Sequence, residues 1–170
     1  MADTKYSARD LHAWLMGKAL EASGTHARRV IRANDDRARD ATIIGKLYFF
    51  AYDPKWKDKL SKYDKFPMVF PIEMYGDGFL GLNLHYLNVA ERQRLLGRLM
   101  EFANNDKMNK TTKLKLSYDL IQSTRNLNSL AKPCIKRYLY SHCRSKFIQI
   151  HADEFDKAIQ LPVADWVFNR

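Results

Sequence analysis

The sequence predicts an α+β fold, with a small antiparallel sheet or partly open barrel flanked by helices on both sides. Between residues 45 and 87, three segments combine aromatic, β-branched and alternating apolar residues, and Gly, Pro and Asp bound them. Such segments are typical of short strands. On either side of this region, apolar residues recur at the spacing of amphipathic helices. Three strands that bury one face can form a stable sheet, whereas two rarely can.

Length and composition indicate one globular domain. The chain has 170 residues, of which 46% are hydrophobic and 12% aromatic, and these proportions exclude an intrinsically disordered protein. No segment approaches the roughly 20 apolar residues that span a bilayer, and residues 1–5 lack the apolar core of a secretory signal. Cys134 and Cys143 are too few for a disulfide scaffold. We expect no membrane partner and synthesis in a reducing, intracellular compartment.

Residues 1–44 are predicted to form an N-terminal helical arm, and residues 45–170 a single α+β domain. Ser7 and Asp10 have the spacing of a capping box, which predicts a helix start. Five arginines follow between residues 28 and 39, but three aspartates lie among or next to them. Because this segment has few large apolar residues, we interpret it as a solvated helix that lies on the domain or on a partner.

Within the domain, the elements are predicted from caps and turns. Gly76 and Gly78 predict a tight turn between the second and third strands. Asn88 predicts one helix cap, and Thr111 or Thr112 the next. The three strands are predicted over 46–52, 67–73 and 79–87, a short helix over 135–142, a fourth strand over 147–150 and a last helix over 153–159. Aromatic residues at 166–168 need a partner surface, in this chain or in another.

Basic residues are concentrated in one part of a chain whose net charge is +10. Residues 107–146 contain ten Lys or Arg against a single acid, Asp119. An excess of this size predicts a positive patch that attracts either nucleic-acid phosphates or an acidic protein surface. We predict contacts to phosphate or carboxylate groups, without base reading, for Lys113, Lys115, Lys132, Lys136, Arg137, Arg144 and Lys146.

A second basic stretch, residues 55–66, places five lysines around Trp56 and Tyr63. Lysines interleaved with aromatic rings can bind nucleic acid, because the cations contact phosphates and the rings stack on bases. The alternative is a hairpin loop whose rings pack back on the sheet while its lysines remain in water. Trp56 and Tyr63 are therefore secondary candidates for the binding site.

No pattern indicates a catalytic residue, a metal site or a cofactor. No serine lies in a Gly-x-Ser-x-Gly turn. The best set of zinc ligands has spacing unlike that of familiar zinc sites, and buried structural thiols are the simpler interpretation of its cysteines. That set is Cys134, His142, Cys143 and His151.

A metal-dependent nuclease is the enzymatic alternative, because such enzymes need several carboxylates. The acids around the predicted sheet are Asp53, Asp64, Glu73 and Asp77. We expect no strand cleavage. His85 shares a strand face with Asn83, and we interpret it as a hydrogen-bonded core histidine.

Four sequence strings resemble a family of small virion-associated proteins of large contractile-tailed phages (myoviruses), some of which carry the label DNA end protector. The strings span residues 45–55, 63–67, 78–87 and 133–139. The resemblance implies a virion component near packaged DNA or in the tail, without enzymatic activity. The sequence departs from the family pattern at Ser61-Lys62, where Pro-Tyr is expected.

We therefore expect a non-enzymatic structural component of a tailed-phage virion, in the tail, neck or baseplate region. Its basic face is predicted to hold DNA or DNA ends through phosphate contacts. The alternative is a subunit-to-subunit assembly protein that contacts no nucleic acid. The expected partners are other virion proteins in a symmetric assembly, and the expected location is the host cytoplasm after synthesis and the virion after assembly.

Overall fold

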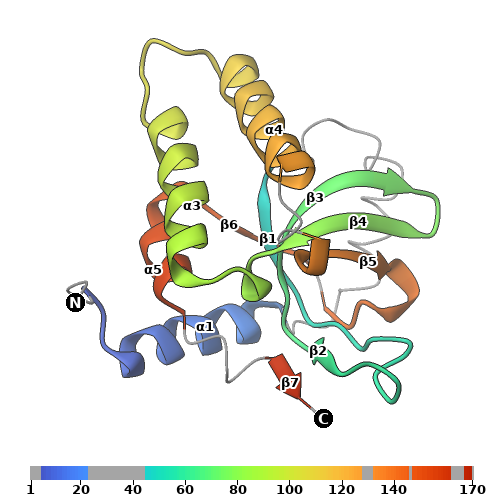
Figure 1. Ribbon diagram of the computed structural model, residues 1–170. Coiled ribbons are helices and arrows are strands. Elements are labelled where there is room, and N and C mark those ends of the chain that lie inside the picture. Colours follow the sequence, from blue (N-terminus) through green and yellow to red (C-terminus); the bar gives the residue numbers. More distant parts are fainter. Residues whose placement is uncertain (1–4, 23–44, 128–131, 146, 162–166, 170) are drawn as a thin grey trace.

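The computed structural model describes residues 5–22, 45–127, 132–145, 147–161 and 167–169. In these ranges it contains four α-helices and a five-stranded antiparallel sheet (Figure 1). The predicted α+β class is confirmed, and of the two predicted forms the open sheet is the one observed. The predicted segment 28–39 and Trp166 lie outside the described residues.

The main sheet has the order β5-β4-β3-β1-β6, and every neighbouring pair is antiparallel. The strand that the sequence predicted at 147–150 forms one edge. A separate two-stranded sheet pairs β2 with β7, so the C-terminal strand finds a partner in its own chain. The bounds are β1 Leu47–Phe49, β2 Lys62–Asp64, β3 Met68–Tyr75, β4 Gly78–Asn83, β5 Ile135–Leu139, β6 Ile148–Ile150 and β7 Val167–Asn169.

The helices are α1 Ala8–Ala22, α3 Val89–Ala103, α4 Lys110–Leu127 and α5 Phe155–Gln160. The capping boxes predicted at Ser7 and Asn88 are confirmed by reciprocal side-chain and backbone hydrogen bonds. The cap predicted at Thr111 or Thr112 is wrong. Instead, the side chain of Asn109 accepts from the backbone N–H of Thr112 at 2.8 Å, because Asn109 directly precedes Lys110, the first residue of α4.

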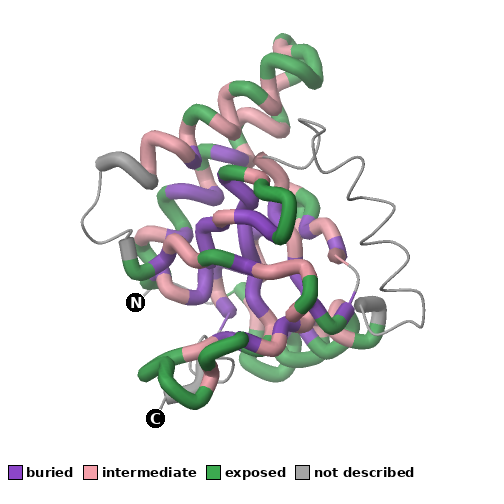
Figure 2. The backbone as a smooth tube through the Cα atoms, turned by 90° about the vertical axis from the view of Figure 1, so that its right-hand side faces the viewer, coloured by how far each residue is buried: buried purple, intermediate pink, exposed green. Residues whose placement is uncertain are grey.

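The two faces of the sheet are covered differently. One face packs against all four helices and forms the main core, which includes Leu15, Leu96, Ile121 and Phe155. The other carries a cluster of aromatic side chains to which none of these helices contributes among the described residues. Phe50 is its centre, with rings of Phe79, Tyr138 and Phe147 at centroid distances of 6.0, 5.5 and 4.5 Å. Figure 2 shows the buried residues concentrated in the middle of the molecule.

Residues 135–139 form a strand, so the helix predicted over 135–142 is wrong. Ile135 and Leu139 have the spacing of a helical face, but they pair with Leu82 and Gly78 of β4. A short apolar segment fits the spacing of a helix and that of a strand equally well. Residues 135–139 form a strand because they pair with the edge of β4. Only Tyr140–His142 turns helically, as one 3₁₀ turn. The third predicted strand likewise ends at Asn83, and Leu84–Tyr86 forms another 3₁₀ turn.

The tight turn predicted from Gly76 and Gly78 is present between β3 and β4, and Gly78 also makes a close contact with β5. A Cβ atom at Gly78 would lie 1.9 Å from the carbonyl oxygen of Tyr138. Only glycine therefore lets β5 pair this closely with the end of β4.

The N-terminal helix packs on the domain. Leu11 and Leu15 of α1 are buried, and Trp14 Nε1 donates to Glu154 Oε1 at 3.0 Å. The segment that would join the predicted arm to the domain, residues 23–44, is not among the described residues. None of the described helices is long and apolar enough to cross a membrane.

Candidate nucleic-acid interface

A groove of about 330 Å³ opens between β5, the 3₁₀ turn after β4, and the loop that leads to β2. We call it the aromatic–lysine groove. It brings together four of the nine predicted site residues, although they lie as far apart in sequence as Trp56 and Arg137. Those four residues are Trp56, Tyr63, Lys136 and Arg137. Lys55, Lys62 and Tyr86 line the groove with them.

Local turns hold Trp56 at the rim of the groove. Lys57 N–H donates to the Pro54 carbonyl at 3.2 Å, and Leu60 N–H to the Trp56 carbonyl at 3.0 Å. The Trp56 side chain is 54% exposed, so its ring does not pack back on the sheet. The ammonium groups of Lys55 and Lys59 lie 5.2 and 5.0 Å from the ring centroid. The exposed Trp56 ring therefore lies next to two lysine cations.

The inner wall of the groove is a buried hydrogen-bond network around Asp64. Phe66 N–H and Asn83 Nδ2 donate to the carboxylate at 2.9 and 3.0 Å, and His85 Nδ1 lies 2.6 Å from Oδ2. Asn83 Nδ2 also contacts the Tyr138 hydroxyl at 3.0 Å. The interpretation of His85 as a hydrogen-bonded core histidine is confirmed. A buried network with these contacts makes a rigid wall.

Lys136 supplies a cation above this wall. Its ammonium group lies 4.5 Å from the centroid of the Tyr86 ring, within the range of a cation–π contact. Burial lowers the pKa of Lys136 and raises the pKa of Tyr86 to about 12. Burial has therefore removed part of the water around the Lys136 ammonium, and an anion bound there would take the place of that water.

The two predicted arginines are already paired with acids. Arg137 forms an ion pair with Asp77 and lies 3.8 Å from the centroid of the Tyr75 ring. Arg144 Nη2 lies 3.3 Å from Asp53 Oδ2, and Lys57 Nζ lies 2.9 Å from Oδ1 of the same carboxylate. Hydrogen bonding from Lys57 in particular lowers the pKa of Asp53. The charges of Arg137 and Arg144 are thus partly neutralised, so the two arginines attract a further anion less strongly than Lys136 does.

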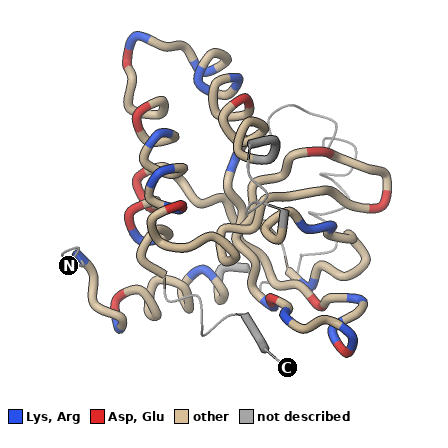
Figure 3. The backbone as a smooth tube through the Cα atoms, viewed as in Figure 1, with Lys and Arg blue, Asp and Glu red and all other residues tan. Residues whose placement is uncertain are grey.

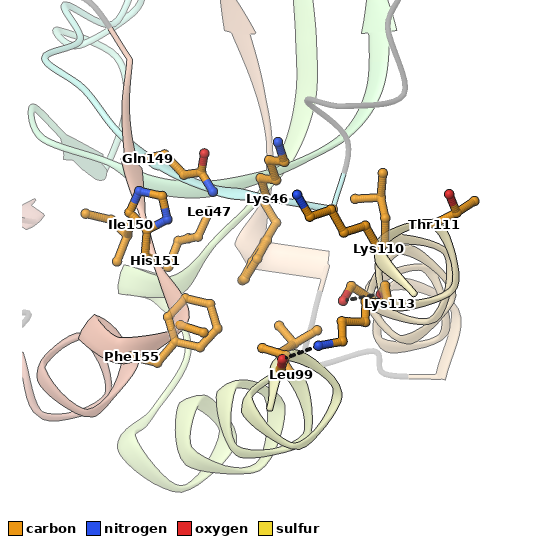
Figure 4. A pocket seen from close by; sticks show the side chains of 16 residues that line it. Lys46, Leu47, Leu99, Lys110, Thr111, Lys113, Gln149, Ile150, His151 and Phe155 are labelled. Carbon is orange, nitrogen blue, oxygen red and sulfur yellow. Dashed lines mark hydrogen bonds between the residues drawn. The ribbon is translucent and has the colours of Figure 1, made fainter. Parts of the chain in front are cut away.

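Lys113 and Lys115 lie on α4, away from the groove. Lys113 lines a second cavity of about 680 Å³ between β1, α3, α4 and α5, which we call the α4 pocket (Figure 4). Lys46 and Lys110 also line this pocket, and Lys113 donates to the Ala103 carbonyl at 2.6 Å. Its floor includes Leu47, Leu99 and Phe155.

The basic residues are thus divided between two places. The lining residues of the groove and of the α4 pocket have no member in common, and Figure 3 shows the Lys and Arg of α4 well apart from those near β2. The side chain of Lys132 and the whole of Lys146 fall outside the described part of the chain. Sequence reasoning missed Tyr86, because it placed this residue inside a strand. It noticed Lys55 and Lys62 but did not select them.

The two cysteine thiols are buried. The predicted buried thiols are observed at Cys134 and Cys143, and burial raises their pKa values to about 11 and about 12. Thiols with such pKa values are poor nucleophiles. Among the described residues there is no group of three or more His, Cys, Asp or Glu that could hold a metal ion.

Comparison with protein-family models matches residues 26–170 to the family described as Phage T4 terminal DNA protecting protein. This match covers all elements from β1 to β7, including every residue of the groove. No curated protein and no solved structure gives a significant match. The resemblance to a phage family with a DNA-end label is confirmed, and the chain belongs to the Phage T4 terminal DNA protecting protein family.

Proposed function

We propose that this protein binds the ends of phage DNA and shields them, as a non-enzymatic component of the virion. The family description supports the link to DNA ends. The observation that carries the proposal is the aromatic–lysine groove, where Lys55, Lys62 and Lys136 surround exposed and half-buried rings. In this proposal, the protein is made in the host cytoplasm and is carried into the virion with the DNA.

Phosphates are the main target of the lysines, because neutralising phosphate charge supplies most of the sequence-independent affinity for nucleic acid. No ion pair with a carboxylate involves Lys55, Lys62 or Lys136 within the described part of the chain. Arg137 and Arg144 contribute less, since Asp77 and Asp53 already neutralise them. Contacts of this type position the protein without reading sequence.

The α4 pocket favours a second role, the binding of a neighbouring virion protein, for Lys113, which lines it, and for Lys115, which is exposed on the same helix. Its apolar floor and basic rim resemble the apolar core and polar rim of a protein–protein interface. A partner with an acidic rim and an apolar side chain at its centre matches this pocket. Such a contact would fix the protein within a symmetric assembly in the tail, neck or baseplate region.

The proposal is tested by end protection. Linear duplex DNA is incubated with the full-length protein and then with an exonuclease that starts at ends. The wild type should slow digestion, and Lys62→Glu combined with Lys136→Glu should abolish that effect. Lys115→Glu, an exposed charge reversal on α4, is the matched control and should protect as well as the wild type.

Closed circular DNA, which has no ends, shows whether the protein selects ends. Used as a competitor, it should relieve protection only at a large excess over linear DNA. Equal competition by circular and linear DNA would overturn the proposal, because it would show general DNA binding instead of end binding. Protection by the double variant at the wild-type level would exclude the groove as the binding site.

A further inference from the structure

We infer that the aromatic–lysine groove accepts unpaired nucleotides at the end of a DNA strand, with their bases stacked on its rings. This inference rests on the proposed function and names the form of DNA end that the groove selects. Fully base-paired DNA is not the ligand of the groove in this inference.

The shape of the groove favours a single strand. It is concave and holds about 330 Å³, near the lower end of the range for small-molecule sites, roughly 300–1,000 Å³. Proteins that read a duplex insert a protruding helix or strand pair into the DNA. A concave site can take up a base only after that base has left the helical stack, which an unpaired terminal nucleotide has already done.

The side chains of the groove have the chemistry of a stacking site. Trp56 is 54% exposed at the rim, and Tyr86 carries the Lys136 ammonium 4.5 Å from its centroid. Every base has a π-face, so aromatic rings bind unpaired bases with little regard to sequence. Lys55 and Lys62 line the same groove, where they can follow the phosphates of the strand.

The acidic residue in the lining does not oppose this ligand. Asp64 is the one Asp or Glu among the described lining residues, and it is only 5% exposed. Its oxygens accept from Phe66 N–H and Asn83 Nδ2 and lie against His85 Nδ1. These groups separate the carboxylate from a strand that lies on the rings above it.

The α4 pocket does not share these features. Its aromatic lining residues are Phe70 and Phe155, both buried in the main core. Lysines are present in both cavities, but a half-exposed ring beside them is found in the groove. Stacking of unpaired bases is therefore assigned to the groove.

The test uses DNA hairpins, each closed by a loop at one end, so that every molecule offers one free terminus. Three termini are compared in fluorescence anisotropy with the full-length protein: blunt, a short unpaired extension, and the same extension built from abasic sites. The abasic extension keeps the phosphates and removes the bases. We expect the natural extension to bind roughly 5- to 100-fold more tightly than the blunt end, and the abasic extension to lose most of that gain.

Variants connect the gain to the groove. Trp56→Ala should bring binding of the natural extension close to that of the abasic one, while Trp56→Phe, which keeps a stacking ring, should retain most of the preference. Far-UV circular dichroism checks that both variants are folded.

Equal affinity for blunt and extended termini, with free termini still preferred over closed circles, would overturn this inference and leave the proposed function intact. An abasic extension that binds as well as the natural one would also overturn it, since phosphates alone would then explain the gain. No preference for any free terminus over closed circles would overturn the proposed function itself.

Discussion

The aromatic–lysine groove and the α4 pocket are two lysine-lined cavities with different surroundings. In the groove, Lys136 lies over the Tyr86 ring and Trp56 is exposed beside Lys55. In the α4 pocket, Lys46 and Lys110 stand over an apolar floor, and Lys113 is bonded to a backbone carbonyl. These surroundings support the proposals that the groove binds a ligand with flat rings and repeated negative charge, and that the pocket binds an apolar side chain with acids around it.

This difference is one that a count of positive charge does not detect, since lysines line both cavities. The neighbours of each cation decide its use. Arg144 has the same formal charge as Lys136, yet Asp53 lies beside it at 3.3 Å. A lysine next to an exposed ring, without an acid nearby, is the better candidate for contact with a nucleic-acid strand.

The largest expected effect comes from removing three cations from each cavity in turn. Replacing Lys55, Lys62 and Lys136 by Gln should lower affinity for DNA ends several hundredfold at about 0.1 M salt, because each lost phosphate contact removes about 0.9 from the salt slope. Replacing Lys46, Lys110 and Lys113, the three lysines of the α4 pocket, should cost less than about threefold, because we expect no phosphate contact there. Titrations at several salt concentrations measure both slopes. Equal losses would erase the distinction between the two cavities.

A smaller effect is expected from a backbone contact in the wall of the groove. Gly78→Ala should lower the free energy of unfolding by about 3 kcal/mol, because the new Cβ would lie 1.9 Å from the Tyr138 carbonyl oxygen and force β4 from β5. Gly76→Ala is the control in the same turn, where a Cβ would meet nothing within 4 Å, and should change stability by less than about 0.5 kcal/mol. Urea denaturation measures both. Similar free energies of unfolding for Gly78→Ala and Gly76→Ala would show that β5 can move away from the new Cβ atom without loss of stability.

The buried network behind the groove should matter somewhat less. Asn83→Ala removes one donor from Asp64 and one from Tyr138, and the loss of these buried hydrogen bonds should lower the free energy of unfolding by about 2 kcal/mol. The change should also weaken DNA binding, since the network holds the wall beneath Tyr86. Unfolding by urea and anisotropy on the same sample test both effects. Unchanged stability would mean that water replaces the amide.

The smallest effect concerns pH and the side of the molecule near the α4 pocket. Burial alone would raise the pKa of Glu154, but donors from Lys18, Trp14 and the His151 backbone outweigh it, so the pKa lies below its usual 4.5. Its contribution to stability is therefore complete above about pH 4.5 and is lost as the pH falls through the folded-state value. Glu154→Gln should remove less than about 1 kcal/mol at neutral pH, because solvent screens a partly exposed group.

The same variant should reduce the dependence of melting temperature on acid pH, while DNA binding stays unchanged because Glu154 is not in the lining of the groove. A wild-type melting temperature that does not change between neutral pH and about pH 3 would contradict the role assigned to this carboxylate.

Much of the fold follows from local sequence patterns. The Ser7 and Asn88 caps, the β1 and β3 segments, and the β6 strand were predicted in place, because each depends on residues within one turn or one strand. The cap at Asn109 and the strand at 135–139 were not. Asn109 competes with two threonines only a few residues away, and the strand depends on pairing with residues about 55 positions earlier, Gly78 to Leu82.

The candidate site divides in the same way. The sequence by itself determined which residues carry charge and rings, and it indicated Trp56, Tyr63, Lys136 and Arg137 as members of two separate segments. Only the tertiary structure decided that these segments meet in one groove, that Lys113 and Lys115 lie elsewhere, and that Asp77 and Asp53 neutralise the arginines. Contacts between distant segments depend on how strands pair and helices pack, which local propensity does not encode.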